Sequence, residues 1–162
     1  MKQDTHIVVQ LEQQKLVLHK AGKPIAVYRV STALKGPGEQ SGSEQTPRGQ
    51  HVIRAKIGAG LPENAVLVGR RFTGEIYNEK LAERFPGRDW ILTRILWLSG
   101  SEVGFNRLGE VDTMRRYIYI HGTPESEPMG VAKSHGCIRM HNADLIDLFD
   151  RVESGCPVLI EE

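Results

Sequence analysis

A histidine and a cysteine sixteen residues apart constrain this chain more than any other feature. An apolar β-type run, Tyr117 to Ile120, ends at His121, and Cys137 stands between Gly136 and an apolar residue. The loop between the two is rich in Pro, Gly and Glu, so it can return the chain to the strand end. An imidazole beside a thiol can make a nucleophile. We therefore expect a fold that places the end of one strand beside the cysteine loop.

Short β-type runs make up most of the rest of the chain. They alternate apolar and polar residues, or are short and apolar, and turn residues separate them. The first three fit an antiparallel meander, and the most apolar run, 90–98, should be a central strand. We expect strands at 7–11, 16–18, 25–30, 51–57, 90–98, 117–121 and 158–160, with loops at 31–49 and 100–112. The predicted fold class is therefore mainly β (α+β).

Two helices are expected. The clearer one follows the cysteine, with Asn142 as a candidate N-cap and Gly155 as a fitting stop. Its apolar face repeats at helical spacing and comprises Leu145, Leu148, Phe149 and Val152. A shorter helix, capped by Asn78, is expected at 78–85. It lies within residues 58–88, which either cover the core or, as the family resemblance described below implies, flank a substrate cleft.

Size and composition exclude several classes of protein. The 162 residues fit one domain, 1–162, and their formal net charge of +1 favours neither nucleic acid nor an anionic membrane. No run approaches the roughly 18 apolar residues of a membrane helix. The first residues contain no apolar leader segment, so we expect a cytoplasmic protein, or a periplasmic one if a leader was removed.

The two cysteines do not imply a disulfide framework, and Cys156 is expected to be a filler residue. A zinc site is an alternative reading, because His121, His135, Cys137 and His141 could supply four ligands in number. The spacing of these residues does not match common zinc motifs. We therefore expect neither a metal nor a cofactor.

Three motifs together resemble the YkuD-like L,D-transpeptidases, which are cysteine enzymes of bacterial peptidoglycan. They are His121-Gly122-Thr123, the run Ser134-His135-Gly136-Cys137-Ile138-Arg139-Met140, and the Thr-Pro-x-Gly segment at 46–49. The resemblance extends from Ile7 to Ile160. It departs from the family pattern at Arg139, where asparagine is often found. The resemblance implies a mixed β-sandwich catalytic domain with one long helix after the cysteine.

The resemblance also implies roles for the motif residues. Cys137 would be the nucleophile, His121 its base, and the carbonyl of Gly122 the group that orients the imidazole. The amides of Gly136 and Cys137 would stabilise an oxyanion. Ser134, His135 and Arg139 are expected to bind substrate. For Arg139 two readings remain open: pairing with a substrate carboxylate, or locking the loop to backbone carbonyls.

The implied substrate is a muropeptide or peptidoglycan tetrapeptide stem. Attack at the L-centre of meso-diaminopimelate would release D-alanine. Water as the acceptor would give a tripeptide, and a second stem would give a 3→3 cross-link. We expect a hydrolytic L,D-carboxypeptidase of cell-wall recycling, with a cross-linking L,D-transpeptidase as the alternative. A non-catalytic peptidoglycan-binding module is a further alternative. A carbapenem is the expected covalent inhibitor.

Overall fold

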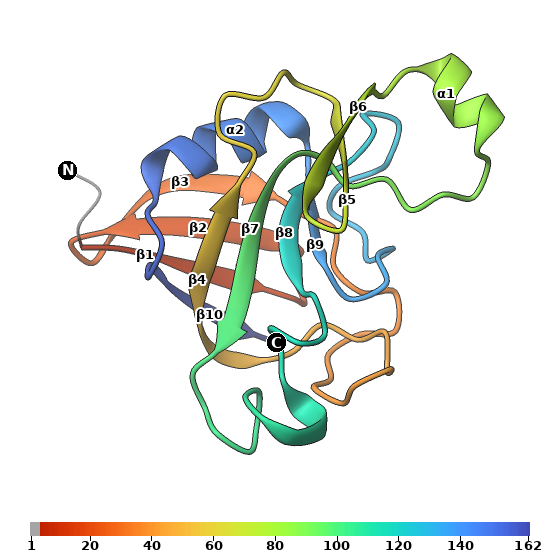
Figure 1. Ribbon diagram of the computed structural model, residues 1–162. Helices are drawn as coiled ribbons and strands as arrows, with labels where there is room; N and C mark the ends of the chain where they lie inside the picture. The colour runs from red at the N-terminus through yellow and green to blue at the C-terminus, as the bar shows by residue number, and fades with distance from the viewer. Residues whose placement is uncertain (1–3) are drawn as a thin grey trace.

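One ten-stranded mixed sheet dominates the computed structural model, which describes residues 4–162 (Figure 1). The strand order is β3-β2-β1-β10-β4-β7-β5-β6, with β8 paired to β7 and β9 paired to β8. The strands are β1 (Thr5–Gln10), β2 (Lys15–Lys20), β3 (Lys23–Arg29), β4 (Gly49–Ile57), β5 (Ala65–Val68), β6 (Arg71–Ile76), β7 (Leu92–Gly100), β8 (Tyr119–Gly122), β9 (Ile138–Met140) and β10 (Pro157–Glu161). The helices are α1 (Glu79–Arg84), the 3-10 turn η1 (Gly109–Val111) and α2 (Asn142–Arg151).

Two strand pairs are parallel and the others are antiparallel. β1 pairs with β10, placing Ile7 opposite Val158, and β8 pairs with β9, placing His121 opposite Arg139. Each parallel pair joins segments connected by a long crossover, as parallel pairing requires. The mainly β prediction with one long helix after the cysteine is confirmed.

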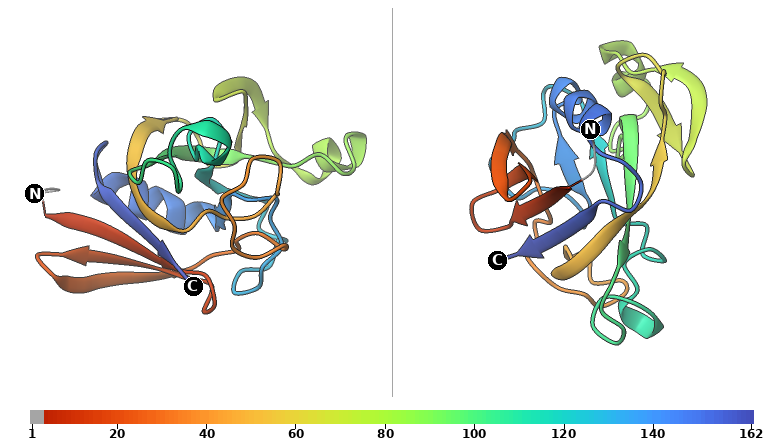
Figure 2. Two further views of the ribbon diagram at one scale, coloured as in Figure 1. Left: turned by 90° about the horizontal axis from the view of Figure 1, so that it is seen from below. Right: turned by 90° about the vertical axis from the view of Figure 1, so that its left-hand side faces the viewer.

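The core lies between two parts of this sheet and α2. β1 to β3 form one layer, and β4, β7 and β8 form another (Figure 2). Alternate residues of β1 and β2, including Ile7 and Leu18, are fully buried. They share a cluster with Leu98 of β7, Ile120 of β8 and Leu148 of α2. Burial of each such side chain contributes roughly 1.5–3 kcal/mol, so this cluster fixes the position of β8.

The helix predictions are confirmed in part. In α1 the side-chain oxygen of Asn78 accepts the Leu81 amide at 2.8 Å, as a cap does. In α2 the expected N-cap is wrong: the cap position is His141, and Asn142 is the first helical residue. Asn142 is fully buried because its amide group is hydrogen-bonded inside the protein. The helix ends at Arg151, before the expected stop at Gly155.

Two strands near the predicted site have different bounds from those expected. β8 begins at Tyr119 and not at Tyr117, because Tyr117 has a left-handed backbone with φ +57°. β7 begins at Leu92 rather than at residue 90, and Thr93 within it has φ +77°. The β7–β8 register shifts between Leu92 and Ile95, as at a β-bulge.

Among the described residues, no helix is long and apolar enough to cross a bilayer.

Candidate active site

The ends of β8 and β9 place the predicted residues around one cavity. In a strand, residues two apart point to the same face, so Tyr119 and His121 point together. A cavity of about 450 Å³ is lined by both, and by Ser134, His135, Cys137 and Arg139. The structure thus brings together five of the expected site residues: His121, Ser134, His135, Cys137 and Arg139.

His121 is held in one tautomer by its neighbour. The side chain is 1% exposed, and its Nδ1 lies 2.6 Å from the carbonyl oxygen of Gly122. A carbonyl can only accept, so Nδ1 carries the hydrogen and Nε2 keeps a lone pair. Burial lowers the pKa of His121 from its ordinary value, more than the Gly122 hydrogen bond raises it. The ring is therefore neutral at pH 7 and can accept a proton at Nε2.

The thiol of Cys137 contacts backbone groups in this structure. The amide of Tyr119 donates to Sγ at 3.3 Å, and the thiol donates to the carbonyl of Tyr117 at 3.4 Å. Burial raises the pKa of the Cys137 thiol to about 12, so at neutral pH the thiol is protonated. The thiol therefore has to turn from the Tyr117 carbonyl toward His121 before it can transfer its proton. Catalytic hydrogen bonds commonly form only in the substrate complex.

Hydrogen bonds within the cysteine loop use two groups that were expected to face substrate. The hydroxyl of Ser134 donates to the Cys137 carbonyl at 2.5 Å and accepts the Gly136 amide at 3.2 Å. The Ser134 hydroxyl was expected to bind substrate and the Gly136 amide to stabilise an oxyanion, but in this structure both are used within the loop. The Cys137 amide remains the candidate oxyanion donor. Gly136 has φ +131°, a conformation that only glycine adopts readily.

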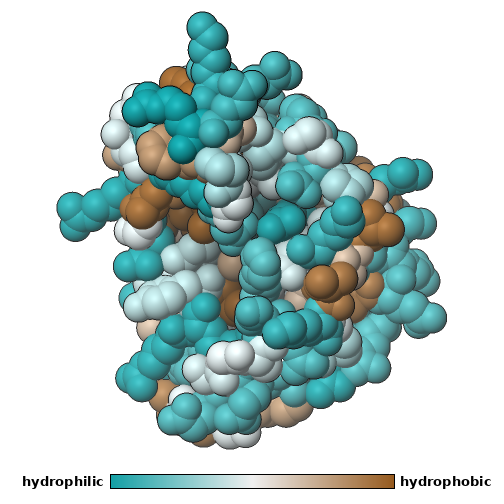
Figure 3. Space-filling model, turned by 90° about the vertical axis from the view of Figure 1, so that its right-hand side faces the viewer, coloured by the Kyte–Doolittle hydropathy of each residue, from teal (hydrophilic) through white to brown (hydrophobic). Residues whose placement is uncertain are grey.

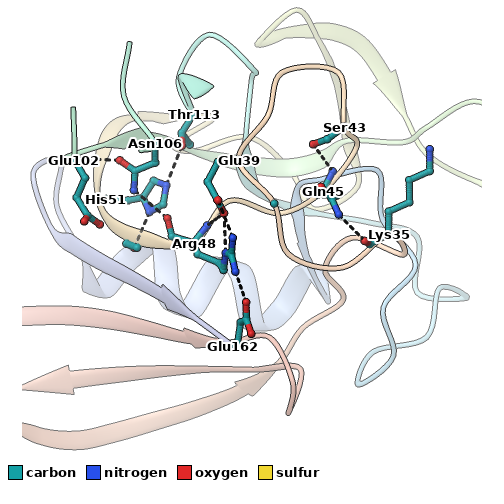
Figure 4. Close-up of polar contacts among 12 residues, drawn as sticks. Lys35, Glu39, Ser43, Gln45, Arg48, His51, Glu102, Asn106, Thr113 and Glu162 are labelled. Atoms are coloured by element: carbon teal, nitrogen blue, oxygen red, sulfur yellow. Dashed lines mark hydrogen bonds and ion pairs between the residues drawn. The ribbon is translucent and has the colours of Figure 1, made fainter. Parts of the chain in front are cut away.

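The Thr-Pro-x-Gly segment supports the cysteine loop from behind. The Thr46 hydroxyl donates to the Gly136 carbonyl at 2.9 Å and accepts the Ala33 amide at 3.0 Å. Arg48 anchors this segment through two hydrogen bonds of 2.9 Å to the carboxylate of Glu39 (Figure 4). Thr46 is fully buried, so its role is to hold the loop rather than to contact substrate.

Arg139 already has carboxylate partners. Its Nη2 lies 3.1 Å from Asp89 Oδ1, and its Nη1 lies 3.8 Å from Glu127 Oε2. Asp89 also lies 3.7 Å from Nδ1 of His135, which is exposed at the cavity. The structure thus favours the role in which Arg139 locks the loop. Its partners are the carboxylates of Asp89 and Glu127 and not the backbone carbonyls that were expected. Asp89 itself was missed, because no motif surrounds it in the sequence.

Two further arginines in the cavity wall were also missed. Arg116 donates to the Gln45 carbonyl at 2.6 Å and so ties the long loop to the approach of β8. Gly69 and Arg70 form the turn between β5 and β6 and also line the cavity, so residues 58–88 contribute to its wall.

Figure 3 shows a mainly hydrophilic face with separate hydrophobic areas. Within residues 4–162, no group of three or more His, Cys, Asp and Glu side chains could hold a metal.

Comparisons with known proteins identify the family and the fold of this chain. The family model YkuD, the L,D-transpeptidase catalytic domain, matches residues 4–160. The putative L,D-transpeptidase YqjB of Bacillus subtilis is 28% identical over 159 residues, 98% of this chain and 72% of the relative. Among solved structures, L,D-transpeptidase 3 from Mycobacterium tuberculosis with a faropenem-derived adduct has a TM-score of 0.61 at 16% identity.

A second solved structure, LdtMt1 in complex with imipenem, has a TM-score of 0.57 at 16% identity. At such identities the two structures support the fold alone. The matches cover 98% of this chain, which spans 60% and 59% of those two chains. The family model, which matches nearly the whole chain, carries the assignment. The chain belongs to the L,D-transpeptidase catalytic domain family.

Proposed function

We propose that this protein is a cysteine acyl-transfer enzyme that acts on peptidoglycan stem peptides and releases D-alanine. The observation that carries the proposal is the shared cavity of Cys137 and His121, in which the Gly122 carbonyl fixes the imidazole tautomer. This arrangement supplies a nucleophile, a base and a group that orients the base. The family membership of the chain supports the choice of substrate.

In the proposed first step, Sγ of Cys137 attacks the carbonyl carbon at the L-centre of diaminopimelate as the thiol proton passes to Nε2 of His121. The Cys137 amide donates to the oxygen that becomes negative. Collapse of this intermediate breaks the C–N bond, and the imidazolium returns the proton to the departing D-alanine. A thioester on Cys137 remains.

We propose water as the acceptor in the second step. His121 takes a proton from water as the water attacks the thioester carbonyl. The C–S bond then breaks, and the imidazolium returns the proton to the departing thiolate of Cys137. The cavity, at about 450 Å³, lies in the range that one small ligand fills. A cross-linking reaction would need further room for a second stem beside the first. Water needs no second binding site, so hydrolysis to a tripeptide is the reaction that we propose, and 3→3 cross-linking is the alternative.

A product assay tests the proposal. Incubation with a tetrapeptide muropeptide should give the tripeptide and D-alanine, while a 3→3 dimer would favour transpeptidation. Cys137→Ala should abolish turnover, His121→Ala should lower kcat by about 10²- to 10⁴-fold, and Cys156→Ala should serve as the active control. Turnover retained by Cys137→Ala would refute the mechanism. Binding of stem peptide without turnover by the wild type would favour the non-catalytic module.

The inhibitor expectation follows from the same thiol. A β-lactam carbonyl is an acylating group, and two solved relatives carry a faropenem-derived adduct or imipenem. We propose that a carbapenem acylates Cys137. Mass spectrometry should detect one adduct on the wild type and on Cys156→Ala, and none on Cys137→Ala.

A further inference from the structure

Arg70 stands in the cavity wall on the turn of the β5–β6 hairpin. Gly69 and Arg70 both have positive φ, +55° and +64°, as the tight hairpin turn requires. The Arg70 guanidinium donates from Nη1 to the phenol oxygen of Tyr119 at 3.0 Å. Its central carbon lies 4.7 Å from the ring of Trp97 and 4.9 Å from the ring of Tyr117. Three aromatic residues therefore hold the guanidinium in place.

None of these three partners is an anion. By contrast, Arg139 pairs with two carboxylates. Arg116, which forms no ion pair within residues 4–162 either, instead donates to the backbone carbonyls of Gly38, Glu39 and Gln45. Among the ion pairs found within residues 4–162, none involves Arg70. A guanidinium has five N–H donors in a planar fork, and the hydrogen bond to Tyr119 uses one nitrogen. Arg70 thus offers a pre-positioned positive charge without a counter-ion.

The same tyrosine connects this charge to the nucleophile. The backbone amide of Tyr119 donates to Sγ of Cys137, while its phenol oxygen accepts from Arg70. The length of one tyrosine side chain therefore separates the two contacts. When the scissile carbonyl of a peptide lies at Sγ of Cys137, the nearest carboxylates of that peptide are a few covalent bonds from the scissile carbonyl. A fixed guanidinium at that distance matches a carboxylate in charge and in fork geometry.

We propose that Arg70 binds a carboxylate of the donor stem peptide and so selects substrates that carry this charge at the scissile bond. The inference rests on the proposed function. The candidates are the free carboxylates on the two residues that flank the scissile bond: the C-terminal carboxylate of D-alanine and the carboxylate at the D-centre of diaminopimelate. Both present the same chemistry, so the experiment has to distinguish them.

A cycle of enzyme and substrate changes tests the proposal. kcat/KM is measured for wild type and Arg70→Gln on the native tetrapeptide, on its C-terminal amide, and on the peptide amidated at the D-centre. Loss of a charge-assisted hydrogen bond should lower kcat/KM of Arg70→Gln about 10- to 100-fold on the native peptide. On one of the amides the variant and the wild type should differ less than about threefold. Equal losses on all three peptides would overturn the proposal.

Arg71→Gln is the matched control, because Arg71 is the next residue along the hairpin and is exposed and outside the cavity wall. It should leave kcat/KM within about twofold on every peptide. Arg70→Lys keeps the charge but loses the planar fork, so it should fall between wild type and Arg70→Gln. Thermal unfolding of each variant separates loss of binding from loss of folding.

A second measurement separates failure of this inference from failure of the proposed function. Iodoacetate and iodoacetamide both alkylate sulfur with loss of iodide, and only the first carries a carboxylate. In a Cys156→Ala background, Arg70→Gln should lower the ratio of iodoacetate to iodoacetamide rates at Cys137 by about threefold or more, and Arg71→Gln should not. If no stem peptide is turned over, this ratio still decides whether Arg70 attracts carboxylates. An unchanged ratio would refute the inference.

Discussion

The side-chain oxygen of Asn142 lies directly beside the α-carbon of Gly122, so that a Cβ added at Gly122 would be 2.2 Å from Asn142 Oδ1. The same oxygen accepts the Thr93 hydroxyl at 2.8 Å, and the Asn142 amide nitrogen donates to the Thr123 carbonyl at 3.1 Å. The first residue of α2 therefore packs against the segment whose carbonyl orients His121. Gly122 is needed for this close approach.

Substitution Gly122→Ala should damage both stability and activity. The new methyl group would also meet the Leu92 carbonyl at 2.5 Å, and such overpacking costs about 1–3 kcal/mol of unfolding free energy. Displacement of the Gly122 carbonyl would release His121, so kcat should fall more than about tenfold. Urea unfolding and the muropeptide assay measure the two effects. Gly130→Ala, where a Cβ meets nothing within 4 Å, should lower stability through backbone strain but leave kcat within about twofold.

Removal of the Thr46 hydroxyl should loosen the cysteine loop. Thr46→Val keeps the shape but leaves the Gly136 carbonyl and the Ala33 amide without their partner, which costs about 1–3 kcal/mol. Thr46→Ser retains the hydroxyl and should keep most of the stability and activity. The free energy of unfolding and the rate of D-alanine release are compared for the two variants. Equal behaviour of Val and Ser would show that the hydroxyl does not support the loop.

Alkylation of Cys137 should keep accelerating at alkaline pH. Because burial raises the thiol pKa to about 12, the thiolate fraction increases about tenfold per pH unit from pH 7 to pH 10. The iodoacetamide rate in a Cys156→Ala background should follow this slope. A rate already constant between pH 7 and pH 9 would instead indicate a resting thiolate–imidazolium pair.

Stability should fall in mild acid because of His51. Its ring is buried, donates to the Gly49 carbonyl and accepts from Thr113 (Figure 4), and burial lowers its pKa to about 4. Between pH 6.5 and 4 the unfolded chain binds a proton that the folded chain does not. Stability present above pH 6.5 is therefore lost as pH falls, by about 3 kcal/mol from this group.

The variant His51→Gln tests that assignment. Its unfolding free energy, measured by urea titration at several pH values, should decrease less between pH 6.5 and 4 than that of the wild type. Above pH 7 the two curves should run parallel, because the His51 ring is neutral in both states there. An identical acid slope in both proteins would assign the pH dependence to other groups.

Features with a local cause could be predicted from the sequence. The Asn78 cap and the buried face of α2 depend on neighbours within one or two helical turns, and both are confirmed. The contact between His121 and Gly122 also joins adjacent residues, but it was expected from the family resemblance. The assembly of His121 and Cys137 at one cavity followed from motifs that the resemblance supplied.

Other features depend on contacts between distant segments. Tyr117 turns into a left-handed conformation, and its carbonyl accepts the thiol proton that was expected to face His121. Asn142 resembles an N-cap in sequence but is drawn into the core by Thr93 and Thr123.

The sequence by itself determined the fold class, the nucleophile and base candidates, and the helices, because periodicity and short motifs encode them. Only the tertiary structure decided which charges surround the thiol. Arg70, Asp89 and Arg116 come from a hairpin turn and two loops without motifs, and they meet at the cavity only after β5, β7 and β8 pair. The physical reason is that a charge acts through distance in space, which separation along the chain does not reveal.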